Sequence, residues 1–295
     1  MTARRTSIAG ILAWAALLGM TYALFNNTLA GLFHRWWHDP TYSHGLLVPA
    51  VSLFFLYERR EKLRNIGGTG SLWGAMALIV AVGLFFVGRM GNMLFVQAVA
   101  FIVTMAALAL LAGGWKFLAV TSFPILFLVF MCPLPSALYD PFSARLRLFA
   151  SAVSTVLLQI SGVIATRSGN IISLANASLS VEDACSGIRS LFGITATATA
   201  FAFMTPGGLL RKAVLVCSAL PIAVVSNILR VTGTGLLYQY VGNAFAEGFY
   251  HSLEGWVFYV VALAALFGEF FLIDAVFSRS TEKADGREGI AEGAR

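Results

Sequence analysis

Long apolar runs separated by short polar stretches make up most of this sequence. The first half contains five such runs, and all but the short second one approach or exceed the length of about 18–20 residues that crosses a bilayer as a helix. They cover residues 7–33, 44–57, 71–87, 92–112 and 115–131, and three more cover residues 185–204, 213–237 and 251–277. Because a helix satisfies its own backbone hydrogen bonds in lipid, the pattern predicts an all-α polytopic membrane protein with about eight transmembrane helices.

The segment between the fifth and sixth runs has a different pattern. Arg145 and Arg147 lead into a moderately apolar stretch, which we interpret as a helix lying on or dipping into the outer leaflet. The alternative, a ninth crossing over residues 143–165, would invert the orientation of every later helix. Residues 169–182 then alternate apolar and polar positions around a turn, which predicts a small extracytoplasmic β-hairpin.

Composition excludes a soluble globule. Hydrophobic residues make up 58% of the 295 and charged residues 12%, about half the charged fraction of soluble proteins. The net charge of +6 lies in short clusters between apolar runs, so it indicates orientation and not a nucleic-acid partner. We expect the amino terminus inside, one membrane domain over residues 1–278 and a disordered cytoplasmic tail over residues 279–295.

Three chemically distinct side chains reach the same membrane face in this topology. Cys185 begins a span that descends from the outer face, Arg230 lies near the outer end of the returning span, and His251 begins the last descending span. A thiolate is a nucleophile, an imidazole transfers protons near neutral pH, and a guanidinium stabilises an oxyanion. Together they indicate acyl transfer through a thioester. Singly, each has an ordinary explanation as a packed thiol, a snorkelling cation or a solvated ring.

Neighbouring residues add to this pattern. A helix start at Cys185-Ser186-Gly187 brings unpaired backbone N–H groups near the sulfur, which favours thiolate. Glu254 is one helical turn from His251 and is spaced to orient the imidazole. Arg189 follows Cys185 by one turn and is spaced to assist the thiolate.

Five separate boxes resemble the exosortase/archaeosortase family of membrane cysteine transpeptidases. Three carry the candidate chemistry, and two lie in the first half of the chain. The boxes are Asp39-Pro-Thr-Tyr-Ser-His-Gly45 with Leu47-Val-Pro49, Phe123-Pro-Ile-Leu-Phe-Leu-Val-Phe-Met-Cys-Pro-Leu-Pro135, Ala184-Cys-Ser-Gly-Ile-Arg189, Asn227-Ile-Leu-Arg230 and His251-Ser-Leu-Glu-Gly-Trp256. The resemblance covers about residues 30–260.

The resemblance implies a role for each matched residue. Cys185 would be the nucleophile, His251 the general acid and base, and Arg230 the oxyanion or substrate clamp, with Asn227 in a supporting position. Substrates would be secreted proteins with a carboxy-terminal Pro-Glu-Pro signal, a transmembrane helix and a basic cluster, and Arg189 is a candidate for contacting the acidic residue of that signal. The site would lie at the extracytoplasmic face of a bacterial inner membrane. The other partners would be membrane lipids and an unknown acyl acceptor.

The remaining polar residues and cysteines of the sequence are not assigned to catalysis. We assign Asp39, Tyr42 and His44 to shaping a substrate entrance, since His34, His38, Asp39 and His44 match no standard metal-ligand spacing. No cofactor motif is present, so no cofactor or metal is predicted.

A polytopic transporter, or a subunit of a polysaccharide or lipid export system, is the alternative function, since Pro124 and Pro221 interrupt spans and a buried arginine suits a transported substrate. Pairing of Cys132 with Cys185 in an oxidising compartment is a further possibility.

Overall fold

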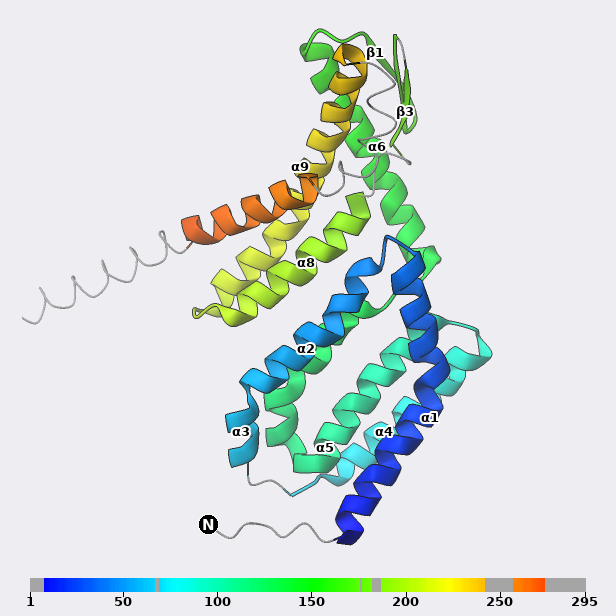
Figure 1. The fold of residues 1–295 in the computed structure, drawn as a ribbon, viewed down its shortest axis with the longest axis vertical. Coiled ribbons are helices and arrows are strands. Elements are labelled where there is room, and N and C mark those ends of the chain that lie inside the picture. Colours follow the sequence, from blue (N-terminus) through cyan, green and yellow to red (C-terminus); the bar gives the residue numbers. More distant parts are fainter. Residues whose placement is uncertain (1–7, 67–68, 176, 182–186, 242–256, 274–295) are drawn as a thin grey trace, which may run out of the picture. The chain divides into compact units, whose positions relative to one another are not determined.

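The computed structural model describes residues 8–66, 69–175, 177–181, 187–241 and 257–273 (Figure 1). The chain divides into two compact units, Met1–Ser136 and Ala137–Arg295. The single domain expected over residues 1–278 includes parts of both units, and the expected tail lies outside the described residues.

The first unit consists of helices joined by short turns. α1 (Ile8–His38) leads through the 3-10 turn η1 (Ser43–Leu46) into α2 (Leu47–Glu58) and α3 (Arg60–Asn65). α4 (Leu72–Met90), α5 (Leu94–Phe127) and the 3-10 turn η2 (Leu128–Met131) complete it. α4 packs closely on the first part of α5, because Gly74 and Gly88 leave room for the backbone of the neighbouring helix.

α5 is interrupted at Gly113 and Gly114, whose backbone angles are not helical. The φ of +68° at Gly114 is accessible to glycine at little cost. Both outer ends of the segment reach the same end of α1: a Cβ at Gly31 would lie 3.4 Å from Leu94, and Trp36 Nε1 donates to Met131 O at 2.9 Å. The segment therefore folds back on itself, in two arms that match the predicted spans 92–112 and 115–131.

Aromatic and hydroxyl contacts join α2 to the second arm of α5. The buried ring of Phe55 lies 5.2 Å from Phe123 and 5.7 Å from Phe127, both edge-on. Ser52 donates to Pro124 O at 2.7 Å. The run 44–57, predicted as the second span, thus coincides with the apolar helical segment that η1 and α2 form together.

α6 (Ser136–Ile160) starts at the boundary residue and forms the first helix of the second unit, and a three-stranded antiparallel sheet follows it. The strands are β1 (Ala165–Ser168), β2 (Ile171–Leu174) and β3 (Ser178–Ser180), in the order β1-β2-β3. β2 and β3 form the predicted hairpin, with Ile172 opposite Leu179. β1 was not predicted as a strand, because its buried Ala165 follows directly on Val163 and Ile164 and extends the preceding apolar run.

Three helices form the core of the rest of this unit. α8 (Gly187–Met204) and α9 (Leu209–Tyr240) form a helical hairpin, and the helix Val257–Ile273 packs against it (Figure 1). Their shared core contains Leu191, Ile194, Ala198, Ala202, Leu215, Ala219, Ala223, Ala262 and Leu266.

Among the described residues, three helical segments are long and apolar enough to cross a membrane: Leu72–Met90, Leu94–Met131 and Leu209–Tyr240. Ser43–Glu58, Leu191–Met204 and Val257–Ile273 are shorter apolar helices. A helical, multi-pass membrane protein with a small sheet is therefore confirmed, whereas the count of eight spans stays a prediction. α6 is not among these apolar segments, and its position relative to the bilayer also stays a prediction.

Candidate active site

The buried stripe of α9 that faces α8 changes from apolar to polar along its length. Leu215, Ala219 and Ala223 pack against α8, at intervals of four residues. Asn227 continues this spacing, and Arg230 and Thr234 follow at intervals of three and four, so they lie near one side of the helix. Arg230 and Thr234 are each only 7% exposed.

The polar part of this stripe lies level with the start of α8. At 1.5 Å per residue, α8 rises about 26 Å from Met204 back to Gly187, and α9 rises about 27 Å from Leu209 to Asn227. Since the two helices pack as an antiparallel hairpin, these rises put Asn227 at the level of the first described turn of α8, and Arg230 about one turn further on. Cys185 precedes Gly187 by two residues in the sequence.

Serine hydroxyls tie this part of α9 to two neighbouring helices. Ser226 donates to Phe258 O at 2.9 Å, near the beginning of the helix Val257–Ile273. Ser154 of α6 donates to Ile228 O at 3.2 Å. The Ser226 hydroxyl and the Ile228 carbonyl, one on each side of Asn227 in the sequence, therefore anchor this turn of α9 to its neighbours.

The side-chain oxygen of Asn227 lacks a hydrogen-bond donor among the described residues. This atom, Oδ1, is buried. A buried acceptor without a partner costs about 1–3 kcal/mol, so such groups call for an explanation and often have a functional one.

The structure brings together segments that adjoin the predicted catalytic residues. The start of α8 lies at about the level of Asn227 on α9, and the neighbouring Ser226 binds the carbonyl of Phe258, seven residues after His251. Cys185, Ser186, His251 and Glu254 themselves lie outside the described residues. Arg189 lies in the first turn of α8, where the structure describes the backbone.

Sequence reasoning missed Ser226, Ser154 and Thr234. Thr234 donates to Arg230 O at 2.9 Å, and its spacing of four residues from Arg230 was the available signal. Ser226 and Ser154 are linked to their acceptors across 32 and 74 residues, so no local pattern identifies them.

Asp39, Tyr42 and His44 lie in the first unit, in the turn that joins α1 to α2. Asp39 pairs with Arg35 at 3.6 Å and accepts from Thr41 N at 2.9 Å. Tyr42 is 7% exposed, and His44 Nε2 lies 3.2 Å from Phe130 O. These contacts give the three side chains structural roles, and their part in a substrate entrance stays an expectation.

Trp36 and Gly45 complete this turn. The Trp36 indole lies directly against Gly45, and a Cβ there would collide with the ring. Since Trp36 also donates to Met131 O, the α1–α2 turn is packed onto the end of η2.

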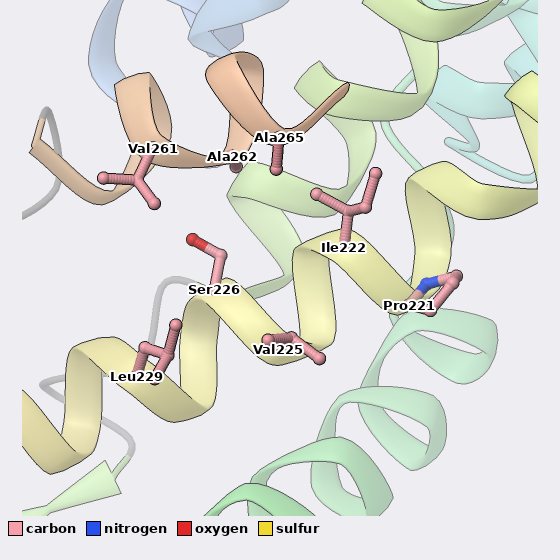
Figure 2. Close-up of a pocket in the computed structure, with 8 residues that line it drawn as sticks. All are labelled: Pro221, Ile222, Val225, Ser226, Leu229, Val261, Ala262 and Ala265. Atoms are coloured by element: carbon pink, nitrogen blue, oxygen red, sulfur yellow. The ribbon is translucent and has the colours of Figure 1, made fainter. Parts of the chain in front are cut away.

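An apolar groove lies between α9 and the helix Val257–Ile273 (Figure 2). It has a volume of about 260 Å³ and is lined by Pro221, Ile222, Val225, Ser226, Leu229, Val261, Ala262 and Ala265. Its lining contains no titratable side chain, and its single hydroxyl, on Ser226, donates to Phe258 O. The groove therefore offers apolar packing and no acid, base or nucleophile.

The two described cysteines are free thiols in different environments. Cys132 follows the apolar segment that ends at Met131, and its burial raises the pKa of the thiol to about 12. Its Sγ lies 3.8 Å from Leu128 O. Cys217 is exposed on α9. Within the described part of the chain, no group of three or more His, Cys, Asp or Glu side chains is placed to hold a metal ion.

These features define a helical, multi-pass membrane protein with a buried arginine and, on the same helix, a buried amide oxygen that no described donor reaches. The sequence model for transmembrane exosortases matches residues 36–268, most of the chain and all five boxes. The chain belongs to the transmembrane exosortase family. No curated protein and no solved structure gives a significant match.

Proposed function

We propose that this protein is a membrane-embedded cysteine protease and transpeptidase. It cleaves the carboxy-terminal Pro-Glu-Pro sorting signal of secreted proteins and transfers them to an acceptor, at the extracytoplasmic face of a bacterial inner membrane. Family membership supports the reaction class. The observation that carries the proposal for this chain is the buried Arg230, one turn beyond the level at which α8 begins.

The first half of the reaction forms a thioester. The Cys185 thiolate attacks the scissile carbonyl carbon, and negative charge develops on the carbonyl oxygen. Arg230 and the N–H groups at the start of α8 stabilise that charge. The C–N bond breaks as the His251 imidazolium gives its proton to the leaving amine, which departs with the signal.

The second half releases the thiolate. A nucleophile, either water or an amine of the acceptor, attacks the thioester carbonyl and gives its proton to the neutral His251 imidazole. The C–S bond breaks, the sulfur leaves as thiolate, and the imidazolium that results is ready for the next cycle.

The remaining site residues support these steps. The Asn227 oxygen accepts a hydrogen bond from the bound peptide or from a catalytic group, which would explain why this buried oxygen has no described partner. Glu254 orients His251, and Ser186 adds a hydroxyl beside the nucleophile. Arg189 meets the acidic residue of the signal, and Asp39, Tyr42 and His44 border the entrance.

Charge and helix length support an extracytoplasmic site. Arg211 and Lys212 begin α9, and positive clusters favour the cytoplasmic side. Arg230 lies nineteen positions after Arg211, a rise of about 29 Å along the helix, which is close to the thickness of the hydrocarbon core. If Arg211 lies at the inner boundary, Arg230 therefore lies near the outer one.

Processing of a co-expressed reporter with a Pro-Glu-Pro signal tests the proposal. Cys185→Ala should abolish the size change on an immunoblot, because the nucleophile is lost. Cys217→Ala removes an exposed thiol elsewhere in the second unit and should process the reporter normally. Full processing by Cys185→Ala would exclude Cys185 as the nucleophile and favour the transporter alternative.

A further inference from the structure

The first unit contains a second groove, far along the chain from the candidate catalytic residues. It has a volume of about 460 Å³ and is formed where α2 ends and α3 begins. Its lining combines three leucines, one tyrosine and two arginines: Leu53, Leu56, Tyr57, Arg60, Leu63 and Arg64.

The two arginines are four residues apart, so they lie on one side of α3. The Arg60 guanidinium lies 4.0 Å from the centre of the Tyr57 ring, and Nη1 donates to Tyr57 O at 3.1 Å. This contact orients the guanidinium at the groove and uses one of its five N–H groups. Glu58 and Glu61 are exposed and do not line the groove, so the charge of its lining is positive.

The apolar part of the groove continues an apolar helix. Leu53 and Leu56 belong to the segment Ser43–Glu58, and Leu53 is 65% exposed. The groove therefore lies where apolar helix surface gives way to cationic surface, as a helix does at the boundary between acyl chains and headgroups.

We propose that this groove binds an anionic phospholipid. The phosphate lies between Arg60 and Arg64, and an acyl chain lies along Leu53 and Leu56. A free phosphate would use the arginines but leave the leucines uncovered, whereas a zwitterionic lipid brings its own cation to the arginines. Charge complementarity and the apolar wall together select a lipid with a net negative headgroup. This inference is independent of the proposed enzymatic activity.

The test uses the full-length protein in detergent and counts bound lipid by native mass spectrometry. Phosphatidylglycerol and phosphatidylcholine are the probes. The variant is Arg60→Gln with Arg64→Gln, and the control is Lys62→Gln with Lys116→Gln. The control removes the same charge from exposed positions that do not line the groove.

We expect the wild type and the control to retain phosphatidylglycerol over phosphatidylcholine. The arginine variant should lose about 30-fold in phosphatidylglycerol affinity, since it removes two cations and each cation near a membrane surface contributes about 1 kcal/mol. Arg64→Glu is a second variant with the same expected direction, in case the double variant is not well folded. Equal binding by the arginine variants and the control would overturn the proposal. Displacement of the lipid by excess inorganic phosphate would overturn it as well, because a phosphate site would then suffice.

Discussion

Arg59 Nη1 donates to the carbonyl of Val120 at 2.8 Å, and this carbonyl is the one that Pro124 leaves without its helical donor. In a regular helix the N–H of residue 124 would bond to the oxygen of residue 120, but proline has no N–H. A guanidinium from the end of α2 thus repairs the hydrogen-bond gap in the second arm of α5. The same proline offers its own carbonyl to Ser52.

Removing this guanidinium should destabilise the first unit. Arg59→Met keeps most of the side-chain volume but leaves the Val120 carbonyl without this donor. We expect a loss of about 1–3 kcal/mol, measured as a lower midpoint of thermal unfolding in detergent. Lys62→Met, at an exposed position of α3, should have the same unfolding midpoint as the wild type within the error of the measurement. Equal midpoints for the two variants would mean that the hydrogen bond from Arg59 to Val120 O does not contribute to the stability of the protein.

Gly45 and Gly83 form a matched pair for testing the α1–α2 turn. A Cβ at Gly45 collides with Trp36, whereas a Cβ at Gly83 has no atom within 4 Å. Gly45→Ala should cost about 1–3 kcal/mol, because the indole that donates to Met131 must shift. Gly83→Ala should be neutral or slightly stabilising, because alanine favours helix. Thermal unfolding of both variants distinguishes close packing from a general intolerance of alanine.

Arg230→Lys tests the geometry of the cation separately from its charge. Lysine keeps the positive charge but lacks the planar fork of donors. If the fork stabilises the oxyanion, initial rates of reporter processing should fall by about 100-fold or more. Arg167→Gln, at an exposed position of β1, should process at the wild-type rate. A wild-type rate with lysine at position 230 would limit the role of Arg230 to charge alone.

Asn227 offers a test that separates function from stability. Asn227→Leu replaces a buried oxygen that has no partner among the described residues with a methyl group of similar size, so stability should stay equal or rise by about 1 kcal/mol. Processing should nevertheless fall if the carboxamide serves the reaction. Thr232→Val is the control, because Thr232 Oγ1 is also buried without a described partner but is not among the proposed site residues. A loss of processing in both variants would point to altered packing and not to the carboxamide.

The Cys132 thiol should resist alkylation at neutral pH. Burial raises its pKa to about 12, so the protonated form predominates up to that pH, and the thiolate that reacts with iodoacetamide is scarce at pH 7–8. The labelling rate, followed by peptide mass spectrometry, should rise tenfold per pH unit over pH 7–10. Rapid labelling at pH 7 would contradict a buried thiol, and Cys132→Ser should leave reporter processing unchanged.

The sequence predicted the helical framework well because its signal is local. Each arm of α5 carries its own apolar run, and the adjacent glycines at 113 and 114 mark the turn between them. The hairpin of β2 and β3 was equally visible, since its alternation spans a single turn. Arg230 was selected because a cation inside an apolar run is costly unless it has a role.

The contacts that hold the site together could not be predicted in this way. Nothing in the residues around Ser226 specifies a bond to the backbone of residue 258, because any carbonyl is an equivalent acceptor. The same holds for Trp36 and Met131, which are 95 residues apart. Such pairings depend on the packing of whole helices, which side-chain periodicity constrains only to a face.

The turn at Gly113 and Gly114 also has a consequence for biosynthesis. A connection of two residues is too short for one arm of α5 to lie in the bilayer while the other arm remains outside. We therefore expect residues 94–131 to insert into the bilayer together, as a helical hairpin. α4 would already be inserted, and the hairpin would pack against it.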